Sequence, residues 1–170
     1  MKTEELKAIQ TPIKERYKAQ PDAALITLKA HGRLGEGVTC SVQTGKALAT
    51  AGLHPATGGD GLSACSGDML LEALVACAGV TLNAVATAIG VVVRSGTVRA
   101  EGDLDFRGTL SVAKDAPVGF QRIRLDFDLD TDASEEQLST LMRLTERYCV
   151  VFQTLRQSPD VTVSHHVAAA

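Results

Sequence analysis

The residues of this chain whose type could do chemistry are its four cysteines: Cys40, Cys65, Cys77 and Cys149. A cysteine thiolate can act as a nucleophile or bind a metal ion. Zinc sites use closely spaced cysteines such as Cys-x-x-Cys, whereas these cysteines stand 25, 12 and 72 residues apart. The neighbouring His165 and His166 would point to opposite faces of a strand. The sequence therefore predicts no metal site and no other cofactor, and leaves packing or redox chemistry for the thiols.

Cys77 and Cys149 each lie in a segment whose pattern predicts a helix. The segment 68–89 is apolar nearly all round, so we expect a buried helix that ends at Gly90. A capping box opens a second helix over residues 134–155. Two core helices that pack on each other can bring two thiols together. A buried cysteine is also an ordinary small core residue, so packing remains the alternative.

Cys65 is an alternative disulfide partner for Cys77, which follows it by twelve residues. Ten helical residues span about 15 Å, whereas the Cα atoms of a disulfide lie about 5.5–6 Å apart. The segment 54–67, rich in small and turn-forming residues, would have to fold back along the helix to join them. We therefore expect Cys65 to stay apart from Cys77, and Cys40, on a predicted strand, to be structural.

Strands are predicted on both sides of the first long helix. The segments with strand-like patterns are 25–30, 38–44, 47–53, 91–93, 96–101, 104–110, 122–130 and 161–165. A glycine-rich hairpin connection, residues 32–37, follows the first of them and carries Arg33. This order predicts an α+β fold with antiparallel sheets packed around two long buried helices.

The N-terminal segment differs from the rest of the chain. Residues 3–20 predict a helix that Pro12 breaks or kinks. We therefore divide the chain into a helical extension, residues 1–23, and a single domain, residues 24–170.

Composition and charge exclude several classes of partner. Aromatic residues make up 4% of the chain and its net charge is -3, which speaks against a nucleic-acid partner. The first residues are acidic where a signal peptide is basic. The longest apolar stretch, 69–93, contains Glu72 and Asn83, so we expect a buried helix and strand and no membrane span. A cytoplasmic protein with reduced thiols is the resulting expectation.

Two motifs resemble the OsmC/Ohr family of osmotically induced and organic hydroperoxide resistance proteins. The first is Ser-Gly-Asp-Met-Leu-Leu-Glu-Ala-Leu-Val-Ala-Cys at 66–77, and the second is Glu-Arg-Tyr-Cys-Val-Val at 146–151. The resemblance extends over about residues 24–166. It implies an OsmC-like fold and an interlocked homodimer with active sites at the subunit interface.

The resemblance also implies the role of each candidate site residue. Cys77 would attack a hydroperoxide, and Cys149 would then close a disulfide with it. Arg33 falls where the family has its hairpin arginine, and Asp68 where it usually has a glutamate. Gly67 stands where family members commonly have a proline. These roles describe a thiol peroxidase that reduces organic hydroperoxides in oxidative or osmotic stress and is recycled by a dithiol reductant. The alternative is a non-catalytic dimeric stress protein or small-ligand-binding protein.

The activation of Cys77 poses a physical problem. Burial raises the pKa of a thiol, and the dipole of its own helix does not reach a cysteine at mid-helix. A positive group is therefore expected near the sulfur, with Arg33 the first candidate and Arg147 the second. Asp68 lies nine residues before Cys77, on the other side of the helix, so it would hold the arginine.

Apolar neighbours indicate the kind of hydroperoxide. Leu74, Val80 and Phe152 are expected to form walls near Cys77, which would favour an organic substrate over hydrogen peroxide.

Overall fold

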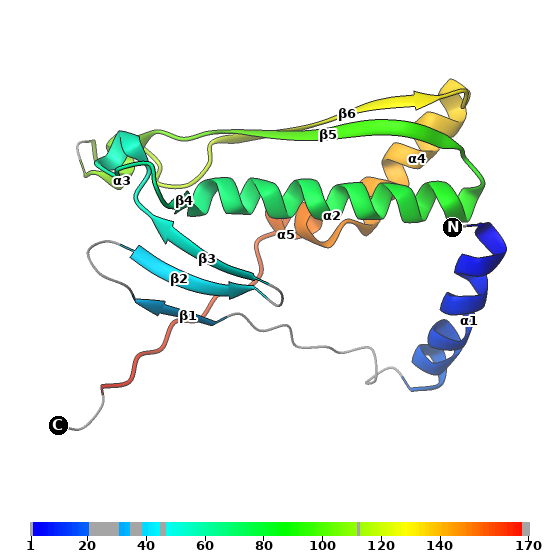
Figure 1. The fold of residues 1–170 in the computed structure, drawn as a ribbon, viewed down its shortest axis with the longest axis horizontal. Coiled ribbons are helices and arrows are strands. Elements are labelled where there is room, and N and C mark those ends of the chain that lie inside the picture. The colour runs from blue at the N-terminus through cyan, green and yellow to red at the C-terminus, as the bar shows by residue number, and fades with distance from the viewer. Residues whose placement is uncertain (1, 21–30, 35–38, 45–46, 112, 168–170) are drawn as a thin grey trace.

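One long helix, α2, runs through the length of the molecule, and the other elements are arranged along it (Figure 1). The computed structural model describes residues 2–20, 31–34, 39–44, 47–111 and 113–167. The elements, in chain order, are α1 (Thr3–Ala19), β1 (His31–Leu34), β2 (Thr39–Thr44), β3 (Ala47–Gly52), the 3-10 turn η2 (Pro55–Thr57), β4 (Ala64–Cys65), α2 (Ser66–Ile89), β5 (Val93–Asp103), α3 (Phe106–Thr109), β6 (Arg122–Thr131), α4 (Glu135–Tyr148) and α5 (Val150–Arg156).

The ends of α2 follow from local chemistry. Cys65 is its N-cap residue, and Asp68 in the first turn suits the positive end of the helix dipole. At the other end, Gly90 adopts the left-handed conformation (φ 75°) and its N–H donates to the carbonyl of Ala86. The predicted stop at Gly90 is therefore confirmed, and the helix begins two residues earlier than predicted.

Two sheets lie on opposite sides of α2 (Figure 1). In the first, β1, β2 and β3 are antiparallel, and the two-residue β4 joins β3 in parallel. The second is a ribbon of β5 and β6, with Val98 opposite Phe127. The predicted α+β arrangement with antiparallel sheets is thus present. The predicted strand 25–30 lies outside the described residues.

The core forms where α2, α4 and the ribbon meet. Leu82, Val85 and Ala86 of α2 pack with Val91 and with Leu141 of α4, which is 0% exposed. Side chains of the ribbon, Phe127 and Leu129 among them, cover this cluster. The alternation of apolar and charged residues along β6 is what lets one face of the ribbon pack here while the other stays wet.

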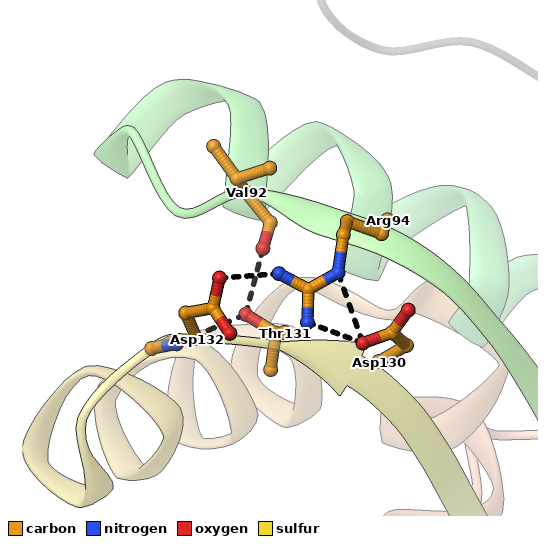
Figure 2. A network of polar contacts seen from close by, with 6 residues as sticks. Val92, Arg94, Asp130, Thr131 and Asp132 are labelled. Carbon is orange, nitrogen blue, oxygen red and sulfur yellow. Dashed lines mark hydrogen bonds and ion pairs between the residues drawn. The ribbon is translucent and has the colours of Figure 1, made fainter.

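A polar network ties the end of the ribbon to the start of α4 (Figure 2). Arg94 of β5 donates from Nε to Asp130 Oδ1 at 3.0 Å and also binds Asp132. Thr131 Oγ1 donates to the carbonyl of Val92 at 2.6 Å. These contacts sit beside the irregularity in the β5–β6 register, and the hydrogen bonds from Arg94 lower the pKa of Asp130.

The predicted capping box at the start of α4 is confirmed. Ser134 Oγ accepts a hydrogen bond from the N–H of Gln137 at 3.3 Å, and Gln137 Oε1 accepts one from the N–H of Ser134 at 2.9 Å. The helix that follows is shorter than predicted, because α4 ends at Tyr148 and a separate helix, α5, begins at Val150.

Four strand predictions are corrected by the structure. Residues 104–110 contain the helical turn α3, because Asp105 caps it by accepting from the N–H of Arg107 at 3.0 Å. The predicted strands 91–93 and 96–101 are replaced by one strand, β5, that runs on through Gly96. Residues 161–165 form no strand within the described part of the chain, where Val163 is 93% exposed.

The burial predicted for α2 is wrong within a single chain. One stripe is buried, made up of Leu74, Ala78, Leu82, Val85 and Ala86. On other faces Leu70 and Ile89 are more than a third exposed, and Val80 is 71% exposed. By length and composition α2 is a helix that could cross a membrane, and 28% of its most apolar window is buried. The α4 helix and the ribbon cover only part of its circumference.

Candidate functional site: a cysteine pair

The break between α4 and α5 falls at Cys149. This residue has an extended backbone (φ -73°, ψ 108°), although its N–H still donates to the carbonyl of Thr145 at 3.0 Å. Its own carbonyl accepts from the N–H of Gln153 at 3.0 Å, which starts α5. The first N–H groups of a helix have no partner within it. The break therefore creates a second set of free backbone donors in the middle of the predicted helix.

Those donors are directed at the sulfur of Cys77 on α2. The backbone N–H groups of Val151 and Val150 lie close enough to that sulfur to lower the pKa of Cys77. The thiol of Cys149 and the hydroxyl of Thr81, one turn further along α2, act in the same direction. The two cysteines that the sequence places on separate helices are thus close enough for each to affect the pKa of the other.

The environment shifts the two thiols in opposite directions. Burial alone would raise the pKa of Cys77, but the hydrogen bonds that its sulfur accepts outweigh it and lower the pKa. Burial raises the pKa of Cys149, and its position as the donor to Cys77 raises that pKa further. The N–H groups of Phe152 and Val151 offset part of this rise. Of the two thiols, Cys77 is therefore the one that loses its proton more readily.

The two cysteines also differ in their exposure to solvent. Cys77 is partly exposed, whereas the side chain of Cys149 is 1% exposed. A reagent from solvent can therefore reach Cys77 before Cys149. Such a pair can pass between dithiol and disulfide.

Uncharged groups that the sequence did not single out contribute to this activation. The first turn of α5 and the hydroxyl of Thr81 lower the pKa of Cys77. The expected contribution of a positive side chain from Arg33 stays a prediction. Sequence reasoning missed Val150, Val151 and Thr81. The β-branched pair directly after Cys149 was the only local hint of a helix break, since such residues are weaker helix formers.

Arg33 and Asp68 are the two remaining predicted site residues. The backbone of Arg33 lies within β1, opposite Ser41 of β2, and so in a strand where a hairpin connection was predicted. The pairing continues at Leu34, opposite Cys40, which is why the strand extends through this position. The side chain of Arg33 lies outside the described part of the structure. Asp68 is exposed in the first turn of α2, and its contact with Arg33 stays a prediction.

Cys65 stands at the far end of α2 from the pair. Its sulfur lies near Gly67, 3.6 Å from where a Cβ would stand, in a region that Phe120 and Leu104 also approach. Eleven helical residues separate it from Cys77. Within the described ranges, no group of three His, Cys, Asp or Glu residues is placed to hold a metal ion.

A pocket of about 330 Å³ is lined by residues that are close in sequence to both cysteines, although neither cysteine itself lines it. Its apolar wall includes Leu74, three residues before Cys77, and Phe152, three residues after Cys149. Arg122 and Arg156 stand at the same pocket, and the guanidinium of Arg156 lies over the ring of Phe152 at 5.8 Å. Val80, expected to form a wall, is exposed and does not line this pocket.

Comparison with known proteins places the chain in a family. The model described as OsmC-like protein matches residues 58–164, so the chain belongs to the OsmC-like family, as its cysteine motifs predict. A search of curated proteins found no match.

Solved structures agree on the fold. An OsmC-like protein from Mycoplasma pneumoniae is 17% identical, with a TM-score of 0.66 over 78% of this chain and 89% of its own. An organic hydroperoxide resistance protein from Elizabethkingia anophelis is 15% identical, with a TM-score of 0.63 over 79% and 91%. One from Legionella pneumophila is 16% identical, with a TM-score of 0.61 over 79% and 92%.

Proposed function

We propose that this protein is a thiol peroxidase that reduces organic hydroperoxides through Cys77 and Cys149. The observation that supports it is the proximity of the two thiols, which lowers the pKa of Cys77 and raises that of Cys149. A structural pair of core cysteines has no need of one ionised member. A peroxidase needs it, because the thiolate is the nucleophile.

The proposed reaction has three balanced steps. The Cys77 thiolate attacks the outer oxygen of the hydroperoxide, the O–O bond breaks, and the departing alkoxide takes a proton and leaves as an alcohol. Cys77 is then a sulfenic acid. Cys149 gives up its proton and attacks that sulfur, so that water leaves and a disulfide forms. A dithiol reductant reopens the disulfide by exchange and is itself oxidised.

The apolar pocket supports an organic substrate. Leu74 and Phe152 give it apolar walls, which a hydrogen peroxide molecule does not need. Two of the structural neighbours are named organic hydroperoxide resistance proteins, and that activity is extended to this chain only as part of the proposal.

A homodimer belongs to the same proposal. The exposed apolar residues of α2 and α5 flank the cysteine pair, with Val80 71% and Val150 69% exposed. A second copy of the chain would cover them and close the site to water. We infer a cytoplasmic location, where thiols are kept reduced between turnovers.

Peroxide consumption in the presence of dithiothreitol tests the proposal. Wild type should consume cumene hydroperoxide faster than hydrogen peroxide at matched concentration, Cys77→Ser should lose the activity, and Cys65→Ser should keep it. Peptide mapping after one equivalent of hydroperoxide should find Cys77 joined to Cys149 within one chain. Wild-type protein that consumes neither peroxide would favour the non-catalytic reading, a dimeric stress or ligand-binding protein.

A further inference from the structure

Thr145 carries the one buried polar side-chain atom that finds no hydrogen-bond partner in the described part of the structure. The residue is 2% exposed, and its Oγ1 is shielded from solvent. The hydroxyl of a threonine within a helix ordinarily donates a hydrogen bond to the carbonyl four residues earlier. Thr87 does so to Asn83 at 2.8 Å, and Thr154 to Val150 at 2.9 Å.

The position of Thr145 links this unused hydroxyl to the cysteine pair. It lies one turn before Cys149 on α4, and its carbonyl accepts the N–H of Cys149 at 3.0 Å. Residues four apart share a helix face, with their Cβ atoms about 5–6 Å apart. Both side chains are buried on that face, at 2% and 1% exposure. The Thr145 hydroxyl and the Cys149 thiol are therefore neighbours on one buried face.

We propose that the Thr145 hydroxyl is held without a partner in the reduced protein so that it can donate to the Cys149 sulfur when that sulfur loses its proton. The inference rests on the proposed function, because it assigns a donor to the second step of that reaction. In the reduced state the Cys149 thiol is close enough to donate to the Cys77 sulfur, and it lowers the pKa of Cys77. A buried thiol that already donates to an acceptor does not need a further donor to its own sulfur.

The Cys149 sulfur needs a further hydrogen-bond donor once Cys77 has been oxidised. A sulfenic acid has taken the place of the thiolate, so the Cys149 proton can leave, and the new anion forms in a dry site. The N–H groups of Phe152 and Val151 face it already. A hydroxyl donor from Thr145 adds a third. Water does not take that role, because Cys149 is only 1% exposed. The proton that leaves Cys149 and the hydroxyl that leaves Cys77 together form water.

Thr145→Val is the sharpest test, because valine keeps the shape and removes only the hydroxyl. Thr145→Ser is the matched control that keeps it. Removing an unsatisfied buried hydroxyl should leave the variant folded with a melting temperature equal to or above that of wild type. A lower melting temperature in Thr145→Val than in Thr145→Ser would mean that the hydroxyl already has a structural partner, and would overturn the proposal.

Two measurements then separate this role from simple packing. In protein with Cys40, Cys65 and Cys77 replaced by serine, thiolate absorbance against pH reports Cys149 alone. Thr145→Val should raise its pKa by about one unit, the worth of one hydrogen bond to an anion, and Thr145→Ser should not. In protein that retains both cysteines of the pair, rapid mixing with hydroperoxide should show unchanged loss of the Cys77 thiolate and about tenfold slower disulfide closure in Thr145→Val.

The two proposals fail in different ways. If wild-type Cys77 is not oxidised by any hydroperoxide, the peroxidase proposal falls, while the absorbance titration of Cys149 still reports on Thr145. If the titration curves of Thr145→Val and Thr145→Ser coincide, or disulfide closure runs at the wild-type rate in Thr145→Val, the hydroxyl is not a donor to Cys149 and the inference is overturned.

Discussion

Cys77 of α2 and Cys149, at the break between α4 and α5, lie close enough for each thiol to shift the pKa of the other, downward for Cys77 and upward for Cys149. Since the thiolate is the nucleophilic form, the proposed reaction begins at Cys77. In the same proposal, Cys149 keeps its proton until Cys77 has been oxidised.

Chemical labelling should report this order directly. Hydrogen bonds lower the pKa of Cys77 and burial raises that of Cys149. As the pH falls from alkaline values, the Cys149 thiolate should therefore be protonated first and stop reacting, and Cys77 should follow at a lower pH. Limited treatment with iodoacetamide at about pH 7 should label Cys77 well before Cys149, since the thiolate is the reacting form. Peptide mass spectrometry measures the two rates, and faster labelling of Cys149 would contradict the assignment.

Val150→Pro should remove one of the donors to Cys77 without disturbing α5. Val150 is the first residue of that helix, the position at which proline is well tolerated. Cys149 already has the extended backbone that a following proline requires. Losing one neutral hydrogen bond should raise the pKa of Cys77 by about half a unit to one unit. The pH midpoint of Cys77 alkylation measures it.

Val150→Ala is the control for that experiment, because it trims the side chain and keeps the N–H. An equal shift in both variants would assign the effect to the apolar side chain. An unchanged midpoint in Val150→Pro would mean that this N–H does not act on the sulfur.

The helix containing Cys77 could be predicted from the sequence, whereas the break at Cys149 could not. Apolar periodicity, a capping box and a terminal glycine are local signals, and Gly90 and Ser134 occupy the predicted places. At Cys149 the apolar pattern continues through Val151 and Phe152, with neither glycine nor proline to mark a stop. The break is held by a contact with another helix, which a pattern read along one segment does not contain.

The same reason limits what could be predicted about the burial of α2. Its composition is that of a fully buried helix, yet one chain covers one stripe only. Composition along one segment does not say how many other elements pack around it.

Arg33→Ala should slow hydroperoxide reduction while leaving the labelling of Cys77 unchanged. Since uncharged donors already lower the pKa of Cys77, the arginine is expected to act on the departing oxygen. We expect a loss of about tenfold or more in turnover, the effect of one charged hydrogen bond. Stopped-flow oxidation and alkylation on the same preparation measure both.

Arg147→Ala is the comparison for Arg33→Ala. The Arg147 guanidinium lies over the ring of Tyr148, 5.5 Å from its centre, and its removal should leave turnover unaffected. If Arg147→Ala slowed the reaction and Arg33→Ala did not, the role would pass to Arg147. A raised pKa of Cys77 in Arg33→Ala would show that the arginine also stabilises the thiolate.

Val80→Asp should separate the proposed dimer into monomers. Val80 lies three residues after Cys77 on α2 and is 71% exposed, so within one chain an aspartate there would be harmless. In a dimer that covers this face, the carboxylate would be buried without a partner, a cost of several kcal/mol. Val92 is equally exposed at 71% but lies beyond the end of α2, so Val92→Asp is the matched control and should remain dimeric. Light scattering coupled to size exclusion measures the mass of each. A wild-type chain that is monomeric at every concentration would refute the dimer, and a dimeric Val80→Asp would move its interface away from the cysteine pair.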